Sequence, residues 1–262
     1  MTGGKFFPVI LIKYGTFMKI SVVTIVRNDC NHIEETLNSV LEQQGEGFEL
    51  EYVVIDGAST DGTAQIIEKY APRLGCFVSE KDSGIYNAMN KGISRCTGEI
   101  IGMINSGDRY LPGTLALVAK SFVEYGKLDR IFWGDVIYQH QGLVKGFREH
   151  NRYRGAFAPH PSMFVPRVIY ETIGTYDESF RLLGDYDFMY RAVNVKKILP
   201  LYVPQPVAFY LEDGLSDRYV LQCLKDELKV KLRYGQHPLA AGTVFLLKIL
   251  KNFRRILKSS TR

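Results

Sequence analysis

Three aspartates lie where a carboxylate, which binds hard cations and accepts protons, could act on a bound ligand. Asp56 follows an apolar stretch at 52–55 and precedes the turn-forming sequence GASTDG. Asp108 ends the segment NSGD after another apolar stretch, and Asp185 lies in GDYDFMYR in the second half of the chain. Because ligands of an open parallel sheet sit beyond the carboxyl ends of its strands, Asp56 is placed to meet one. An ordinary strand-to-helix turn with a helix cap is the alternative for Asp56.

Alternating strands and helices must position these residues. Apolar stretches predict strands at 20–26, 52–55, 76–79 and 99–104, and apolar residues at helical spacing predict helices at 31–43, 63–70 and 85–94. Ser59, Thr60 and Asp61 are candidates to cap the second helix. Strands that alternate with helices at this spacing predict a parallel, doubly wound sheet.

The regular alternation of predicted strands and helices ends after Asp108. The patterns predict helices at 112–125, 186–195 and 217–234, the last capped by Ser216, and strands at 162–165, 198–202 and 207–211. The stretches 130–138 and 143–147 are expected to pair as a hairpin. Short strands and a hairpin predict that a mixed sheet extends the parallel one.

Length and charge limit the classes of function. A chain of 262 residues suits an N-terminal extension at 1–17, one large α/β domain at 18–215 and a helical region at 216–262. The extension is too short to span a bilayer and lacks a cleavage site, and Met18 is an alternative start. A net charge of +5 is too dispersed to indicate nucleic-acid binding. Four cysteines without C-x-x-C spacing favour reduced thiols in the cytoplasm over a zinc site.

Six segments in order resemble one known family. They are ISVVTIVRN, VVIDGASTDGT, SEKDSGIYNAMNKGI, GEIIGMINSGD, PHPSMF and GDYDFMYR, and the resemblance extends over roughly residues 18–211. The series resembles the inverting family 2 glycosyltransferases of bacterial surface-polysaccharide assembly, of the colanic acid, capsule or O-antigen type. This resemblance implies a GT-A fold, with a Rossmann-like, mostly parallel sheet, a smaller mixed portion on the acceptor side and C-terminal helices. It also implies transfer of a sugar from a UDP- or GDP-sugar to a hydroxyl of a glycan or lipid-linked acceptor.

The resemblance places the donor nucleotide at the first half of the chain. The residues that it assigns to the nucleotide are Thr24, Asp56, Lys81, Asp82 and Ser106. Many relatives carry two acidic residues where this chain has Asp56 and Gly57, so the identity of the base is left open. For Lys81 and Asp82 a solvated loop is the alternative.

The resemblance also implies a divalent cation, because a diphosphate leaving group needs positive charge. Asp108 matches the metal-binding position of the family, and Mg²⁺ and Mn²⁺ are equally compatible with it. Asn105 and Gly107 replace carboxylates of the family pattern, which leaves Asp108 alone. One carboxylate suffices where the diphosphate supplies further oxygens.

The acceptor hydroxyl needs a base, and the resemblance assigns that role to Asp185. Asp187 is expected to cap a helix or contact the acceptor or diphosphate, and Arg191 could pair with it one helical turn later. His160 is a candidate contact to diphosphate or acceptor, with a structural role as the alternative. Trp133 could stack on a sugar, although a single tryptophan in a strand more often packs in a core.

The C-terminal segment 244–257 has an amphipathic pattern. Leu246, Leu250, Phe253 and Leu257 form one helical face, and Lys248, Lys251, Arg255 and Lys258 form another. This pattern is typical of a helix at an anionic membrane surface, so we expect a cytoplasmic protein that is peripheral at the inner face of the membrane. A helix that covers the domain is the alternative.

Two other functions compete with the transferase hypothesis. A sugar-phosphate nucleotidyltransferase would carry a glycine-rich phosphate loop after the first strand, whereas Arg27, Asn28 and Asp29 stand there. A catalytically degenerate glycan-binding or assembly subunit is favoured by the missing carboxylates at 57, 105, 107 and 184. A dinucleotide-dependent oxidoreductase is disfavoured, since no G-x-G-x-x-G follows that strand.

Overall fold

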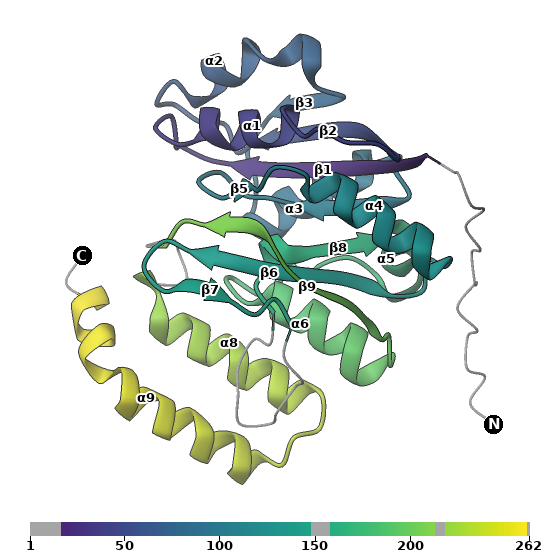
Figure 1. Ribbon diagram of the computed structural model, residues 1–262. Helices are drawn as coiled ribbons and strands as arrows, with labels where there is room; N and C mark the ends of the chain where they lie inside the picture. The colour runs from purple at the N-terminus through teal and green to yellow at the C-terminus, as the bar shows by residue number, and fades with distance from the viewer. Residues whose placement is uncertain (1–16, 148–157, 213–217, 261–262) are drawn as a thin grey trace.

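The computed structural model describes residues 17–147, 158–212 and 218–260 (Figure 1). The predicted extension at 1–17 therefore falls almost wholly outside the described residues, as do the predicted cap Ser216 and the boundary between 215 and 216. Within the described residues, strands from both halves of the chain form one nine-stranded sheet. Helices cover this sheet, and the last two helices lie at the bottom of Figure 1.

The first half of the chain forms the predicted parallel sheet. Its strands are β1 (Met18–Val26), β2 (Phe48–Asp56), β3 (Cys76–Ser79) and β4 (Ile100–Met103), in the order β3-β2-β1-β4. All three pairings are parallel, and Val26, Asp56 and Ser79 share one register position at the carboxyl edge. β1 and β4 are buried almost throughout, which explains their largely apolar sequences.

Three helices connect these strands. They are α1 (Ile33–Leu41), α2 (Thr63–Glu68) and α3 (Ile85–Arg95), and a 3₁₀ turn at Ala71–Arg73 follows α2. The Asp61 carboxylate accepts the backbone N–H of Thr63 at 3.0 Å, so it satisfies one free donor at the start of α2. Gly92 allows α3 to pack closely on β1, because a Cβ atom at Gly92 would lie 2.3 Å from Val23.

The second half continues the sheet with mixed pairing. Strands β5 (Arg109–Tyr110), β6 (Ile131–Tyr138), β7 (Gly142–Val144), β8 (Met163–Pro166) and β9 (Pro200–Tyr210) extend it in the order β4-β8-β6-β9-β5. β6 and β7 pair antiparallel, which confirms the hairpin, and the mixed extension is also confirmed. Short strand β5 and helix α5 (Arg167–Ile173) were not predicted.

Two predictions in this half were wrong in detail. The strands expected at 198–202 and 207–211 are one continuous strand, β9. Register shifts between Trp133 and Val136 of β6 lie opposite Pro204 and Pro206 of β9, neither of which can donate a ladder hydrogen bond. Helix α4 (Thr114–Tyr125) begins two residues after the predicted Pro112, because Gly113 adopts φ 80° at its N-cap.

The remaining helices lie beyond the mixed strands. α6 (Gly184–Tyr190) continues as a π-helical turn, Arg191–Val195, and α8 (Val220–Arg233) precedes α9 (Pro238–Ser260). Glu227 of α8 accepts hydrogen bonds from buried Lys231 and from Lys248 of α9, the latter at 2.6 Å. Lys248 therefore faces α8, which corrects its predicted place on a free basic face.

Among the described residues, none of the helices is both long and apolar enough to cross a membrane.

Candidate active site

The topological switch of the sheet lies between β1 and β4. From β1 the chain winds outward through β2 and β3 and then returns to β4 on the other side. Beyond β4, the N–H groups of Ile104 and Ser106 bond to the carbonyls of Val23 and Ile25, so the chain continues alongside β1. The segments after the parallel strands thus meet at one edge, where α/β sheets bind ligands.

Asp56 organises the turn after β2. Its carboxylate accepts a hydrogen bond from the Ser79 hydroxyl at 2.6 Å and from the Ser59 backbone N–H at 3.0 Å, and it also accepts the Ser59 hydroxyl. Asp56 is fully buried, and Ala58 adopts a left-handed φ of 55° in this turn. The carboxylate thereby fixes the loop that borders the crevice, and direct contact with a nucleotide stays a prediction.

Asp82 brings a carboxylate next to Gly57. A Cβ atom on Gly57 would lie 3.0 Å from Asp82 Oδ2, so the Asp82 carboxylate lies where a side chain at 57 would point. Lys91 holds Asp82 with a 2.7 Å ion pair and also donates to the carbonyl of Lys81. The Lys81 side chain itself is exposed. A carboxylate is thus present beside position 57, although residue 57 itself is glycine.

The other predicted nucleotide residues lie deeper or are already bonded. Thr24 is fully buried and shares a 2.8 Å hydrogen bond with the Tyr52 hydroxyl. Ser106 donates to Asp29 Oδ2 at 2.7 Å. Both lie at or next to the β1–β4 switch, and their contact with a nucleotide stays a prediction.

Sequence reasoning missed the central role of Asp29. Its two carboxylate oxygens contact His32 Nδ1 at 2.6 Å and the Ser106 hydroxyl, while its N–H donates to Thr63 Oγ1 at 2.9 Å. Asp29 therefore ties the loop after β1 to the start of α2 and to the loop after β4. The acidic residue three positions after β1 was the available signal.

Asp108 is the candidate ligand for a cation. Its Oδ1 accepts the backbone N–H of Leu211 at 3.0 Å, and no hydrogen bond to Oδ2 is formed by the described residues. Burial raises the pKa of Asp108 to about 8. The Asn105 side-chain oxygen, in the same turn, is buried without a partner among the described residues. A cation beside Asp108 Oδ2 and the Asn105 side-chain oxygen would offset the cost of burying these two atoms. The two residues therefore fit a hard cation.

The described residues alone supply too few ligands for a closed metal site. In the described part of the chain, no three His, Cys, Asp or Glu side chains cluster so that they could hold a metal ion. This composition fits an ion that takes one or two protein oxygens and completes its coordination with water and substrate phosphate.

Asp185 is joined to the first half of the chain through Tyr86 of α3. The Tyr86 hydroxyl lies 3.1 Å from Asp185 Oδ1 and 2.6 Å from the carbonyl of Leu182. Burial raises the pKa of Asp185, although hydrogen bonds from Tyr186 N–H and Tyr86 oppose that rise. A raised pKa makes the carboxylate a stronger base, as proton abstraction from a hydroxyl requires.

Glycine at position 184 is one departure from the family pattern, and the Tyr86 ring explains it. A Cβ atom there would lie 2.9 Å from ring carbons of Tyr86, which is only 2% exposed and cannot move away freely. A glycine at 184 therefore makes room for the aromatic ring that touches Asp185.

We expect Gly184→Ala to destabilise the protein by about 1–3 kcal/mol, because overpacking forces the Tyr86 ring out of place. Its activity should fall too, since the contact between Tyr86 and Asp185 is lost. Gly242→Ala is the matched control, because a Cβ atom at this helical glycine meets nothing within 4 Å. Urea denaturation of both variants checks the prediction, and equal midpoints would contradict it.

Asp187 has a structural environment instead of the predicted cap. It lies inside α6, which has no side-chain cap, and it is 1% exposed. Its carboxylate contacts Arg233 at 3.2 Å, the Tyr234 hydroxyl at 3.1 Å and Arg191 at 3.7 Å. The predicted pair with Arg191 is therefore present within a larger network that attaches α6 to α8. Contact of Asp187 with acceptor or diphosphate stays a prediction.

Trp133 and His160 both lie against the mixed strands. Trp133 is fully buried and its ring centroid lies 5.1 Å from that of Phe147, which agrees with the core alternative. His160 stands in a 3₁₀ turn before β8, and its Nε2 is buried without a partner among the described residues. Burial lowers the pKa of His160 to about 4, so the ring is neutral at pH 7.

We expect this half-buried histidine, whose Nε2 is enclosed, to weaken the fold in acid. Because its folded pKa of about 4 lies below the ordinary 6.5, the unfolded state binds the proton first and stability falls between pH 6.5 and 4. The loss is at most about 3 kcal/mol, since the side chain is partly accessible. His160→Gln should flatten this acid limb in urea titrations, and parallel curves for the two proteins would contradict the prediction.

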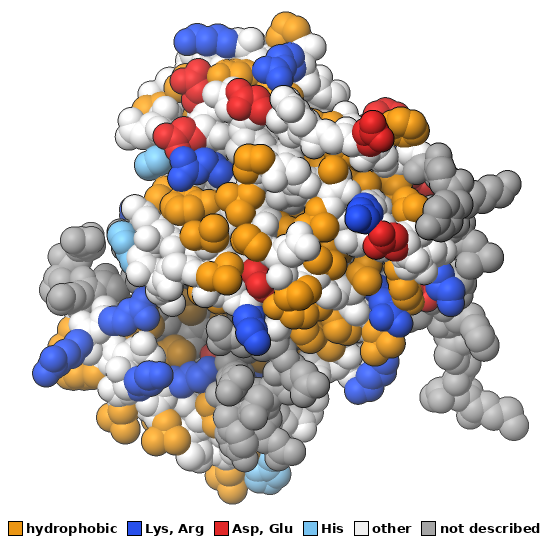
Figure 2. All heavy atoms as spheres, in the orientation of Figure 1, with side chains coloured by type: hydrophobic (Ala, Val, Ile, Leu, Met, Phe, Trp, Pro, Cys, Tyr) orange, Lys and Arg blue, Asp and Glu red, His pale blue; other side chains and the backbone are white. Residues whose placement is uncertain are grey.

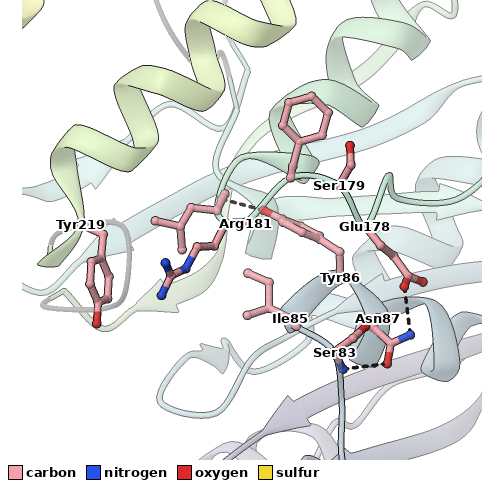
Figure 3. A pocket seen from close by; sticks show the side chains of 11 residues that line it. Ser83, Ile85, Tyr86, Asn87, Glu178, Ser179, Arg181 and Tyr219 are labelled. Atoms are coloured by element: carbon pink, nitrogen blue, oxygen red, sulfur yellow. Dashed lines mark hydrogen bonds between the residues drawn. The ribbon is translucent and has the colours of Figure 1, made fainter.

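A pocket of about 350 Å³ lies beside Tyr86 (Figure 3). It is bounded by the start of α3 at Ser83–Asn87, by the segment Glu178–Leu182 and by Tyr219. The three aspartates do not line it. Tyr86 connects the pocket to Asp185, because Tyr86 borders the pocket and its hydroxyl contacts Asp185.

Comparison with known proteins identifies the class. Residues 21–182 match the model of Glycosyl transferase family 2, so the chain belongs to this family. It is 31% identical over 230 residues to a PGL/p-HBAD biosynthesis glycosyltransferase of Mycobacterium bovis, covering 82% of this chain and 86% of that protein. An uncharacterized glycosyltransferase of Mycobacterium tuberculosis is 31% identical over 183 residues, covering 67% and 69% of the two chains.

Solved structures share the fold. Staphylococcus aureus TarS 1–349 in complex with UDP superposes with a TM-score of 0.64 at 18% identity, over 90% of this chain and 72% of that one. A mannosyltransferase from Pyrobaculum calidifontis in complex with GDP-Man and Mn²⁺ gives 0.62 at 18% identity, over 95% and 77%. The expected GT-A architecture is thereby confirmed.

Proposed function

We propose that this glycosyltransferase inverts configuration as it moves a sugar from a nucleoside diphosphate donor to a hydroxyl of a glycan or lipid-linked acceptor. The observation that carries the proposal is the placement of three aspartates. Asp56 and Asp108 follow β2 and β4 at the edge where the sheet reverses its order, and Asp185 is tied to α3 at that edge through Tyr86.

Asp56 and Asp82 would bind the nucleoside, and the segment around Asp108 would bind the diphosphate. Asp108 and Asn105 would hold Mg²⁺ or Mn²⁺, which supplies positive charge against the leaving diphosphate. The buried, unpartnered oxygen of Asn105 and the available Oδ2 of Asp108 support this assignment.

Asp185 would accept the proton of the acceptor hydroxyl. As that oxygen bonds to the anomeric carbon, the bond from this carbon to the donor phosphate breaks on the opposite side, which inverts the configuration. The Tyr86 hydroxyl shares its proton between the Leu182 carbonyl and Asp185, and it thereby restrains the orientation of the carboxylate. The raised pKa of Asp185 supports its role as the base.

Thermal stabilisation by nucleotide sugars and donor hydrolysis together test this proposal. Thermal stabilisation by UDP- and GDP-sugars identifies the donor, since a ligand at a hundred times its dissociation constant adds roughly 2.7 kcal/mol of stability. Release of free nucleoside diphosphate that requires Mn²⁺ or Mg²⁺ would support a transferase. Release of pyrophosphate from a nucleoside triphosphate and a sugar phosphate would instead indicate a nucleotidyltransferase. Glycan binding without donor turnover would indicate a degenerate binding subunit.

We also propose that α9 binds an anionic membrane surface. Leu246, Leu250 and Phe253 are 60%, 71% and 55% exposed, while Ala241 and Val244 are buried. Exposed Lys251 and Arg254 flank the apolar side chains. Figure 2 shows hydrophobic and basic side chains together in this region. An interfacial helix combines these two features, since apolar side chains enter the bilayer surface and cations meet lipid phosphates.

Vesicle flotation tests the membrane proposal. The triple variant L246S/L250S/F253S should lose binding to vesicles of phosphatidylcholine with phosphatidylglycerol. The matched control is L143S/L199S, which replaces leucines that are similarly exposed elsewhere. Unchanged flotation of the triple variant, or a dimer in sedimentation that only the triple variant disrupts, would overturn the proposal.

A further inference from the structure

The pocket beside Tyr86 has two chemically different ends. At one end the Arg181 guanidinium lies 5.4 Å from the centroid of the Tyr219 ring. At the other end, the Glu178 carboxylate accepts hydrogen bonds from the side-chain amides of Asn87 at 3.0 Å and Asn90 at 2.9 Å. Figure 3 shows Arg181 and Tyr219 on one side of Tyr86, with Glu178 and Asn87 on the other.

Arg181 has no ion-pair partner in the described part of the chain, whereas both Glu178 oxygens are engaged by amides. A guanidinium has five N–H donors in a planar fork that matches phosphate and carboxylate. The Tyr219 ring lies within cation–π distance of this fork and adds an apolar surface beside it. The Arg181 end therefore favours an anion, while the Glu178 end offers acceptor oxygens and amide groups to neutral hydroxyls.

The pocket also has the right place and size for part of a sugar acceptor. The N-terminal turn of α3 forms one wall, directly after Asp82 on the nucleotide side. Tyr86 forms the wall toward Asp185, which places the pocket beside the proposed base and outside its direct contacts. A volume of about 350 Å³ lies in the range of small-molecule sites.

We propose that this pocket binds the part of the acceptor next to the reactive sugar, and that Arg181 pairs there with a phosphate or carboxylate of the acceptor. This inference rests on the proposed transferase function and specifies its acceptor as an anionic glycoside. Glu178 and Asn87 bind hydroxyls of the same unit. The reactive hydroxyl lies beyond Tyr86, at Asp185.

Calorimetric titration with three small sugars tests the proposal. Glucose 1-phosphate carries a phosphate, methyl glucuronoside carries a carboxylate, and methyl glucoside is neutral. Each is titrated with and without the nucleoside diphosphate that stabilises the protein best, so that binding at the donor site is separated. We expect at least one anionic sugar to bind at least about tenfold more tightly than the neutral one, as a charge-assisted pair implies. Whichever anion binds tighter identifies the phosphate or the carboxylate as the group recognised.

Variants assign this preference to Arg181. Arg181→Ala should reduce the affinity for the anionic sugar to that for the neutral one, and Arg181→Lys should restore part of the preference. Arg130→Ala is the matched control, because its guanidinium also stacks on a tyrosine, Tyr125, at 4.3 Å but lies outside the pocket. It should bind all three sugars like the unmodified protein.

Three results would overturn the proposal. They are equal affinity for neutral and anionic sugars, a preference that survives in Arg181→Ala, and binding of inorganic phosphate as tight as that of glucose 1-phosphate. The last result would mean an anion site without a sugar site. Failure of the transferase proposal looks different, because no nucleotide sugar would then bind or be hydrolysed by the unmodified protein.

Discussion

Asp185→Asn is expected to lower kcat for sugar transfer by about 10³-fold, because a positioned base contributes roughly 10²–10⁴-fold and an amide cannot accept the proton. Donor binding should remain, since no predicted nucleotide contact comes from α6. The amide oxygen can still accept the Tyr86 hydroxyl, so we expect little change in stability. Kinetics with a glycan acceptor, together with donor titration by calorimetry, check both expectations.

Asp129→Asn is the matched control for this substitution. Its carboxylate also accepts a tyrosine hydroxyl, from Tyr125 at 3.0 Å. Asp129 precedes β6, however, and therefore lies at the sheet edge opposite the carboxyl ends of the parallel strands. It should retain full transfer activity. Transfer by Asp185→Asn at the unmodified rate would exclude Asp185 as the base, and Asp187 would then become the next carboxylate to test.

Asp108→Asn is expected to remove the stimulation of donor turnover by Mn²⁺ or Mg²⁺, a loss on the order of 10²-fold or more, because charge neutralisation by a metal contributes several kcal/mol. The fold should survive. In metal-free protein the Asp108 carboxyl, with a pKa of about 8, is largely protonated at pH 7, and asparagine resembles it in charge and shape. Its amide oxygen can still accept the Leu211 N–H.

Metal titrations of donor hydrolysis measure this effect. The unmodified protein should lose activity in EDTA and regain it with excess Mn²⁺, whereas Asp108→Asn should respond weakly to either treatment. Asn105→Ala should shift the metal titration in the same direction by a smaller factor, because it removes a neutral ligand. A normal metal response of Asp108→Asn would show that the cation binds elsewhere. No response of the unmodified protein to EDTA and Mn²⁺ would show that turnover is independent of metal.

Sequence determined the helices and strands of the parallel half and the carboxyl ends of its strands. Apolar runs of strand length and helical spacing encode which faces are buried, and these are local properties of the chain. They located β1 to β4 and the helices between them, and therefore placed Asp56 and Asp108 just after strands. The end of the strand–helix alternation after Asp108 likewise indicated the mixed half of the sheet.

Only the tertiary structure decided which side chains meet. Tyr86 and Asp185 are 99 residues apart, and Asp29 and Ser106 are 77 apart, so no local pattern could pair them. The carboxylate beside Gly57 belongs to Asp82, and Lys248 faces Glu227 of α8. Such contacts depend on strand order, register and loop path, which the periodicity of a sequence does not specify. Hydrophobic pattern thus fixed the scaffold, and packing between distant segments assembled the candidate site.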